Sequence, residues 1–248
     1  MRSVWPAVRS ALLWLVSGLH FFTVVPVLIL LAVVLDPRKH DWLQRGLCRR
    51  IVFLAGAKLV VHRAPGFDPQ RTSFFMVNHV NLFDPFVLYS ALPQFVRGWE
   101  LESHFRIPVY GWLMKRFGNV PVPDVRRPSD LKRMWRLTQA AIDGGTSLIV
   151  FPEAKRTRDG RLSEFQDGGF RVVQQLGVPV VPVTVVGSFE HHRTGDWMLR
   201  PATITVYIHD AIETKGLTKD NVPELRDRVR AIIAAPLEEW LKKTRVRA

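Results

Sequence analysis

Apolar positions are continuous near the start of the chain and become periodic further on. Residues 10–35 contain no Lys, Arg, Asp or Glu, and about 20 apolar residues are enough for a helix to cross the hydrocarbon core of a bilayer. Pro26 lies in the middle of this run and can kink a helix, while basic residues flank both ends, namely Arg2, Arg9, Arg38 and Lys39. The pattern predicts membrane attachment, either by a spanning helix or by a kinked segment that returns to the same face.

A second apolar stretch covers residues 47–61 and carries charge near its ends. Its basic residues are Arg49, Arg50 and Lys58. Long basic side chains can keep their stems in an apolar layer while their charges stay at the headgroups. This stretch is therefore predicted to lie at a membrane interface without crossing it.

After Pro65, short β-rich runs alternate with helical patterns, which is typical of an α/β domain. Six runs are apolar and mostly β-branched or aromatic, so we predict strands that are buried on both faces. These strands cover residues 58–63, 73–77, 94–99, 146–151, 180–186 and 203–208.

Capping residues and apolar periodicity predict two long helices in this part of the chain. Ser129 can cap a helix that ends at Gly144 and Gly145. The last helix is predicted over residues 222–243, with a kink or break at Pro236.

The composition adds charge to this picture. The 248 residues include 35 Lys and Arg against 22 Asp and Glu, and the net charge of +13 favours anionic partners such as nucleic acid, acidic lipid or a phosphorylated substrate. Cys48 is the only cysteine. This excludes an internal disulfide and any cysteine-based zinc cluster, because both need several thiols.

The sharpest chemical signal is a polar pair, Asn78 and His79, that ends an apolar strand. Asp84 follows five residues after His79, and the next residue, Pro85, suits the first turn of a helix with Asp84 at its cap. A carboxylate bonded to one imidazole nitrogen would leave the other nitrogen free to accept a proton. The motif predicts His79 as a general base, although a capping aspartate beside a structural histidine has the same spacing.

The sequence offers no obvious protein nucleophile for such a base. Cys48 lies in the apolar N-terminal region, and no G-x-S-x-G elbow occurs. His79 is therefore expected to act on a substrate hydroxyl directly.

A second strand end also runs into charge. Glu153, Lys155 and Arg156 follow the apolar run Leu-Ile-Val-Phe-Pro. An arginine there could form a paired contact with a phosphate, and Glu153 could hold Lys155 or Arg156 in place or bond an acceptor hydroxyl. A solvated turn is the alternative interpretation.

Two further arginines, Arg126 and Arg127, follow a strand-like segment at residues 118–125. They too could bind phosphate.

Together these blocks resemble the glycerolipid acyltransferase family that includes bacterial 1-acylglycerol-3-phosphate acyltransferases. Asn78, His79 and Asp84 match its N-H-x4-D motif, which implies His79 as the base and Asp84 as its orienting partner. Phe151, Pro152, Glu153 and Arg156 match its F-P-E-G-T-R-S block. That match implies that Glu153 and Arg156 bind the acceptor phosphate.

The resemblance spans residues 74–187 and has two departures. Ala154 and Lys155 stand where the family usually has Gly and Thr, and one extra residue precedes Arg126. Either Arg126 or Arg127 could therefore take the role of the arginine in the family's second block. The predicted substrate-binding set is Asn78, Arg126, Arg127, Glu153, Lys155 and Arg156.

The resemblance implies membrane-anchoring helices over residues 1–62 and one α/β catalytic domain, a mixed central sheet flanked by helices, over residues 63–248. It implies transfer of a fatty-acyl group from acyl-CoA or acyl-carrier protein to a hydroxyl of a lysophospholipid such as 1-acylglycerol-3-phosphate, in phospholipid biosynthesis or remodelling. The expected partners are these substrates and membrane lipid, with no metal and no other cofactor. The expected location is the cell inner membrane, with the catalytic domain on the cytoplasmic face.

Competing functions have less support in the sequence. A membrane-anchored basic protein that only binds its partner is the main alternative, but a nucleic-acid binder needs basic and aromatic residues gathered on one face. The positive charges are instead spread along the chain. A metal hydrolase built on His191, His192 and His209 lacks ligand spacing such as H-E-x-x-H, so neither nucleic acid nor metal is expected.

Overall fold

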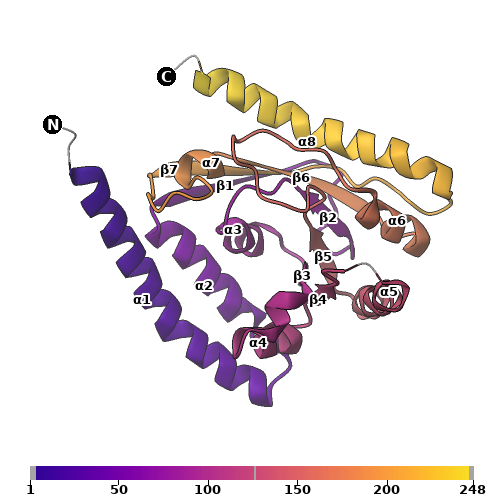
Figure 1. The fold of residues 1–248 in the computed structure, drawn as a ribbon, viewed down its shortest axis with the longest axis horizontal. Coiled ribbons are helices and arrows are strands. Elements are labelled where there is room, and N and C mark those ends of the chain that lie inside the picture. Colours follow the sequence, from indigo (N-terminus) through magenta and orange to yellow (C-terminus); the bar gives the residue numbers. More distant parts are fainter. Residues whose placement is uncertain (1–3, 126, 246–248) are drawn as a thin grey trace.

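The computed structural model describes residues 4–125 and 127–245, and these residues fold around a mixed sheet of seven strands (Figure 1). The strand order across the sheet is β1-β7-β6-β2-β5-β3-β4. The six predicted strands are all present, and their ends lie within two residues of the prediction. The strands are β1 (Ala57–Arg63), β2 (Phe74–Val77), β3 (Val96–Leu101), β4 (Val120–Val122), β5 (Ser147–Val150), β6 (Val180–Val186) and β7 (Ala202–Ile208).

Five neighbouring strands, β6, β2, β5, β3 and β4, are parallel to one another, whereas β7 is antiparallel to β6 and β1 is parallel to β7. Parallel strands place their carboxyl ends at the same edge of a sheet, which is where α/β folds carry their chemistry. The segments that follow β2, β4 and β5 therefore begin along one edge. Figure 1 shows these strands side by side in the middle of the molecule.

The core strands have the burial that their sequences predict. Every residue of β2, β5 and β6 is buried. β1 is an edge strand with several partly or fully exposed residues. The prediction of burial on both faces is wrong for β1, for the second half of β3 and for the start of β7, where residues are partly or fully exposed.

Helices cover both faces of the sheet (Figure 1). Phe75 and Val77 of β2 pack with α2 and α3 on one face, and Phe74 and Met76 pack with α6 and α8 on the other. This alternation along a strand holds the end of β2 between two layers. The helices are α1 (Trp5–Val34), η1 (Pro37–His40), α2 (Asp41–Leu54), α3 (Asp84–Ala91), η2 (Glu102–Arg106), α4 (Tyr110–Phe117), α5 (Pro128–Asp143), α6 (Asp167–Leu176), α7 (Ser188–His191), η3 (Lys219–Asn221) and α8 (Val222–Arg245).

The predicted cap of α5 is wrong, and the predicted break at Pro236 is absent from α8. The residue at the N-cap of α5 is Arg127, with no side-chain capping bond, because Pro128 suits the first turn and starts the helix before Ser129. α8 continues through Pro236 without a break, because Ile233 and Leu237 on either side of the proline are buried in the protein. The predicted end of α5 at Gly144 is confirmed.

The apolar run near the N-terminus forms one continuous helix, α1, which also passes through its proline, Pro26. Among the described helices, α1 is the one whose length and composition would allow it to cross a membrane. It contacts the rest of the molecule near both ends. Ser10 Oγ donates to the Leu199 carbonyl oxygen at 3.0 Å, and Arg116 donates to the Leu35 carbonyl oxygen, just past α1, at 3.0 Å.

The second apolar stretch is divided between the end of α2 and strand β1. Leu47, Cys48, Ile51 and Val52 of α2 are buried, because this helix packs between α1 and α3. The prediction of an interfacial stretch is therefore wrong for these four apolar side chains, which lie inside the protein. The basic residues Arg49, Arg50 and Lys58 are exposed, and so is Phe53.

Candidate active site

The polar pair at the end of β2 brings His79 next to Asp84. His79 Nδ1 lies 2.7 Å from Asp84 Oδ2. The chain can close this contact over five residues because it turns immediately after the strand, and Asp84 is the first residue of α3. Asp84 therefore lies one position inside the helix, whose N-cap is Phe83, not at the cap itself.

The Asp84 carboxylate is surrounded by donors. Its Oδ2 accepts the backbone N–H groups of Val80 at 2.6 Å and Asn81 at 3.0 Å, and its side chain is fully buried. Oδ1 accepts the Ser188 hydroxyl at 3.5 Å. A carboxylate that receives these bonds acts as an acceptor toward His79 as well, so the shared proton lies on His79 Nδ1 and Nε2 carries a free lone pair.

The His79 ring is held in place and remains reachable. It stacks on Phe151, with ring centroids 4.0 Å apart and planes 17° apart. The side chain is 19% exposed, and Nε2 has no hydrogen-bond partner within residues 4–125 and 127–245. This nitrogen can therefore meet a substrate hydroxyl.

Glu153, at the second strand end, lies 3% exposed and connects the two loops. Its Oε1 accepts the His79 backbone N–H at 2.8 Å, and its Oε2 accepts the Ser163 N–H at 2.7 Å. Burial raises the pKa of Glu153, while these hydrogen bonds oppose the shift. In this structure Glu153 positions the backbone of the base.

Three cationic side chains line a hollow of about 430 Å³ beside this loop. Its walls are Lys155, Arg156, Thr157, Arg158, Asp159 and Ser163. Lys155, Arg156 and Arg158 are exposed, and in the described part of the chain neither Lys155 nor Arg156 forms an ion pair with Glu153. Their charges are free to meet an anion.

The hollow adjoins the loop of the base through two of its walls. Thr157 donates its backbone N–H to the His79 carbonyl oxygen at 2.9 Å, and Ser163 is the residue that donates to Glu153. Two walls of the hollow are therefore bonded to the loop of the base and to the residue that positions it.

The remaining predicted site residues take different places. Both ends of the Asn78 side-chain amide bond the backbone of Val185, at 2.9 and 2.7 Å, so Asn78 joins β2 to β6. Arg127 is exposed after β4, at the same edge of the sheet as His79. Arg126 lies outside the described residues.

Two residues that support the site were not singled out from the sequence, Asn81 and Ser188. Asn81 Nδ2 donates to the carbonyl oxygens of Ser188 at 2.7 Å and His192 at 2.8 Å, and its Oδ1 accepts the Phe83 N–H. Asn81 thereby ties the loop of the base to the segment after β6. Its polar side chain inside the N-H-x4-D motif was an available signal, but its partners Ser188 and His192 lie more than 100 positions away along the chain.

The three histidines considered for a metal site do not gather. His191 Nδ1 bonds the Arg200 carbonyl oxygen at 2.8 Å, whereas His209 Nε2 bonds Thr184 Oγ1 at 3.0 Å. Within the described residues, no group of three or more His, Cys, Asp or Glu side chains could hold a metal ion.

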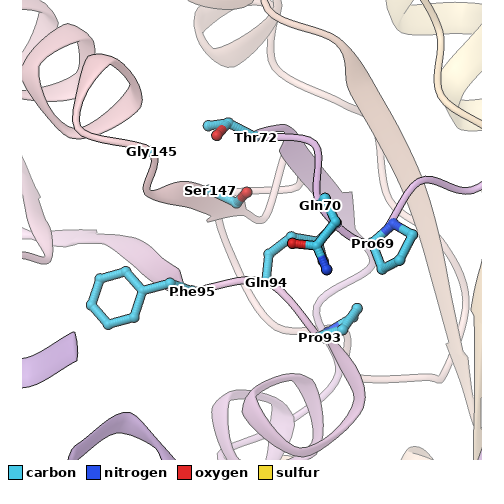
Figure 2. A pocket seen from close by; sticks show the side chains of 8 residues that line it. All are labelled: Pro69, Gln70, Thr72, Pro93, Gln94, Phe95, Gly145 and Ser147. Carbon is cyan, nitrogen blue, oxygen red and sulfur yellow. The ribbon is translucent and has the colours of Figure 1, made fainter. Parts of the chain in front are cut away.

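A second hollow, of about 230 Å³, lies at the amino ends of β2, β3 and β5 (Figure 2). Figure 2 shows the residues that line it, Pro69, Gln70, Thr72, Pro93, Gln94, Phe95, Gly145 and Ser147. Because these residues precede or begin the strands, the hollow lies at the opposite edge of the sheet from His79, and the predicted site residues do not line it.

Ala154, which stands at the glycine position of the F-P-E-G-T-R-S block that the sequence resembles, is a strained residue in the loop. Ala154 has φ +60°, a conformation that disfavours a residue with a Cβ atom. We expect Ala154→Gly to raise the free energy of unfolding by about 1 kcal/mol, measurable by denaturant titration. Ala140→Gly, on the exposed face of α5, should instead lower it by about 0.5–1 kcal/mol. If both variants are destabilised equally, Ala154 is not strained.

Comparison with known proteins agrees with this geometry. The Acyltransferase family model matches residues 58–186, more than half of the chain. A 1-acyl-sn-glycerol-3-phosphate acyltransferase from Chlamydomonas reinhardtii is 30% identical over 170 residues, which cover 68% of this chain and 49% of that protein. One from Haemophilus influenzae is 29% identical over 178 residues, which cover 71% of this chain and 72% of that protein.

The crystal structure of the 1-acyl-sn-glycerophosphate acyltransferase PlsC from Thermotoga maritima has a similar fold. Its TM-score is 0.74 at 22% identity, over 94% of this chain and 97% of that one. The chain spans about half the length of the Chlamydomonas relative. Because the family match includes both strand ends, with His79 and Glu153, this chain belongs to the Acyltransferase family.

Proposed function

We propose that this chain is an O-acyltransferase that moves a fatty-acyl group from a thioester to the free hydroxyl of 1-acylglycerol-3-phosphate. The observation that carries the proposal is the pairing of His79 with Asp84 at 2.7 Å beside a hollow lined by Lys155, Arg156 and Arg158. The His79–Asp84 pair can activate a hydroxyl, and the hollow can hold a phosphate. The names of the related acyltransferases support the same substrate class.

In the proposed reaction, His79 Nε2 takes the proton of the acceptor hydroxyl as its oxygen forms a bond to the thioester carbonyl carbon. The resulting tetrahedral intermediate breaks its carbon–sulfur bond. The leaving thiolate takes the proton from His79, which restores the neutral ring. Asp84 stabilises the charged imidazole between these steps, and no acyl-enzyme is formed.

The acceptor phosphate is assigned to the hollow, with Arg156 as its main contact. A guanidinium can pair two phosphate oxygens, while the ammonium of Lys155 is a point charge. Glu153 supports this contact indirectly, by holding the loop. Arg126 or Arg127 would add a further cation from the end of β4.

The acyl donor is acyl-CoA or acyl-carrier protein, both of which suit a chain with net charge +13. The reaction would serve phospholipid biosynthesis or remodelling at the cell inner membrane, with the catalytic domain on the cytoplasmic face. Of residues 1–62, we propose α1 and α2 as the anchor. The expectation of helices up to residue 62 is wrong at its end, because β1 begins at Ala57 and pairs with β7 in the sheet of the proposed catalytic domain, residues 63–248. The alternative is a membrane-anchored basic protein that binds without catalysis.

We infer that α1 lies along the surface of the bilayer and does not span the bilayer. A helix of 30 residues is about 45 Å long, and α1 is bonded near its start to Leu199, while Arg116 bonds the residue that follows its end. A perpendicular orientation would carry these polar loops through hydrocarbon, where unpaired polar groups are costly. An outward face along the whole helix, including Leu15, Leu19, Phe22 and Leu30, is exposed and suits a lipid layer.

The proposal is tested by offering the purified protein an acyl-CoA with a panel of acceptors. The panel contains 1-acylglycerol-3-phosphate, lysophosphatidylethanolamine, lysophosphatidylcholine and monoacylglycerol, and mass spectrometry follows the products. We expect phosphatidate to form fastest. If monoacylglycerol is acylated at an equal rate, the acceptor phosphate is not recognised. If no acceptor yields product with either acyl-CoA or acyl-carrier protein, the alternative of a membrane-anchored basic protein without catalysis is favoured.

Arg156→Lys tests the phosphate contact at constant charge. We expect the KM for 1-acylglycerol-3-phosphate to rise about tenfold, equivalent to roughly 1.4 kcal/mol, with the donor KM near normal. If the paired contact tightens only in the transition state, kcat falls by that factor instead. Arg171→Lys, on the exposed side of α6, is the matched control. An Arg156→Lys enzyme within twofold of the wild type in both constants would make Arg156 a solvated turn residue.

A further inference from the structure

A second exposed apolar surface lies outside α1, near the C-terminal end of that helix. It is formed by residues 106–112, where five successive residues from Arg106 to Tyr110 are exposed. The most exposed apolar side chains are Ile107 at 49%, Val109 at 62% and Trp112 at 44%. An exposed cluster of this kind marks a surface that meets a partner.

The backbone of this segment is shaped to present these side chains. Val109 has φ +64° and ψ −55°, which is a strained conformation for a β-branched residue. A Cβ atom on Gly111 would lie 2.0 Å from the Phe105 carbonyl oxygen, so the turn is tightly closed around this glycine. The strain places a valine in solvent, where it contributes no packing to the protein itself.

The segment lies next to α1. It leads into α4, which contacts α1 in the fold, and Figure 1 shows α4 beside the end of α1. Leu113 packs against the cluster that contains Leu28 and Ala32, and Arg116 donates to the carbonyl oxygens of Ala32 and Leu35. A layer that covers the outer face of α1 would therefore extend to residues 106–112.

The segment also lies at the reactive edge of the sheet. The segment follows β3, which lies beside β5 and is parallel to it. Glu153 follows β5, so both segments leave the sheet at the same edge. A surface that receives residues 106–112 would lie on the same side as His79.

The flanking residues fit one kind of partner, an anionic phospholipid bilayer. Arg106 and Lys115 are exposed on either side of the apolar residues, where they can meet headgroup phosphates. Tyr110 and Trp112 have the amphipathic rings that favour the membrane interface. A soluble protein partner would not explain why these exposed apolar residues lie next to the exposed apolar face of α1.

We propose that residues 106–112 insert into the headgroup layer of an anionic bilayer and, with α1, hold the reactive edge of the sheet against the lipid. This inference rests on the membrane location in the proposed function. It assigns a second point of attachment and fixes which edge of the protein faces its lipid substrate.

The test uses single cysteines labelled with the environment-sensitive fluorophore NBD. Cys48 does not interfere, because it is buried and burial raises the pKa of its thiol to about 12, leaving it protonated and inaccessible. The labelled positions are Val109→Cys in the segment, Leu19→Cys on the outer face of α1, and Ala231→Cys on the exposed side of α8. Each full-length protein is mixed with vesicles of phosphatidylglycerol and phosphatidylcholine.

We expect a blue shift and a rise in NBD emission at position 109 comparable with those at position 19, and no change at position 231. A change at 19 without one at 109 would overturn the insertion of the segment while leaving the membrane anchor in place. No change at either position would overturn both the segment and the anchor, whereas acyl transfer in detergent would remain a separate result.

A second variant measures how much the segment contributes to binding. Val109→Asp replaces an exposed side chain, so the melting temperature of the variant should match that of the wild type. We expect its affinity for the anionic vesicles to fall about tenfold, which corresponds to losing the burial of one valine. An unchanged affinity would contradict the proposal.

Discussion

Replacing His79 by alanine is expected to lower the rate of acyl transfer by about 10³–10⁴-fold, the upper part of the range that a positioned general base contributes. In the proposed reaction, Nε2 of the His79 ring is the atom that accepts the proton of the substrate hydroxyl. Its removal leaves the backbone bond from residue 79 to Glu153 intact, so the loop should keep its shape. The rate is measured as phosphatidate formed from acyl-CoA and 1-acylglycerol-3-phosphate.

A second histidine provides a matched control for this loss. His62 stacks on Tyr207 with planes 15° apart, much as His79 stacks on Phe151, but it lies on edge strand β1. His62→Ala should keep a rate within twofold of the wild type. Wild-type turnover by purified His79→Ala enzyme would contradict the role of His79.

Asp84→Asn is expected to reduce kcat by about 10²–10³-fold, less than or equal to the effect of removing His79. The Asp84 oxygen that bonds His79 also accepts two backbone N–H groups. An amide can replace some of these bonds, but it no longer stabilises a charged imidazole or fixes the tautomer. The KM values of both substrates should stay near normal, because Asp84 is fully buried and does not meet them.

Stability must be measured alongside kinetics for Asp84→Asn. A buried donor left without its acceptor costs about 1–3 kcal/mol, so the variant should unfold at a lower denaturant concentration. Asp196→Asn, which weakens the 2.7 Å pair with Arg200, is the control for losing a charged pair outside the dyad. The assignment fails if Asp84→Asn loses stability as expected but keeps full kcat.

The dyad and the core strands could be predicted from the sequence because their signals are local. His79 and Asp84 are separated by five residues at the end of a buried run, and a turn there brings them together with few alternatives. The strands β2, β5 and β6 are continuous apolar runs, and each is fully buried.

The role of Glu153 depends on contacts that no local pattern contains. Its partners, the N–H groups of His79 and Ser163, are supplied by different loops, and they meet only because β2 and β5 are neighbours in the sheet. The same reason hid Asn81, whose partners follow β6. The sequence indicated which residues carry charge at the edge but not which of them position the others.

The N-terminal region shows a different limit of sequence reasoning. The apolar residues in 47–52 are compatible with either a lipid interface or a protein core. Packing between α1 and α3 buries them, while Arg49 and Arg50 remain exposed. Conversely, the apolar run in residues 106–112 is too short to indicate a membrane contact from the sequence. Their exposure depends on the tight turn at Val109 and Gly111.

The most direct test of the central claim, direct transfer with His79 as base, is a rapid-quench measurement with a single equivalent of acyl-CoA. The enzyme is first mixed with acyl-CoA alone, and both free thiol and the intact protein mass are followed before 1-acylglycerol-3-phosphate is added. Direct transfer predicts no thiol burst and an unchanged protein mass, followed by equal amounts of phosphatidate and CoA once the acceptor is present. A stoichiometric thiol burst together with a protein heavier by one acyl group would contradict it.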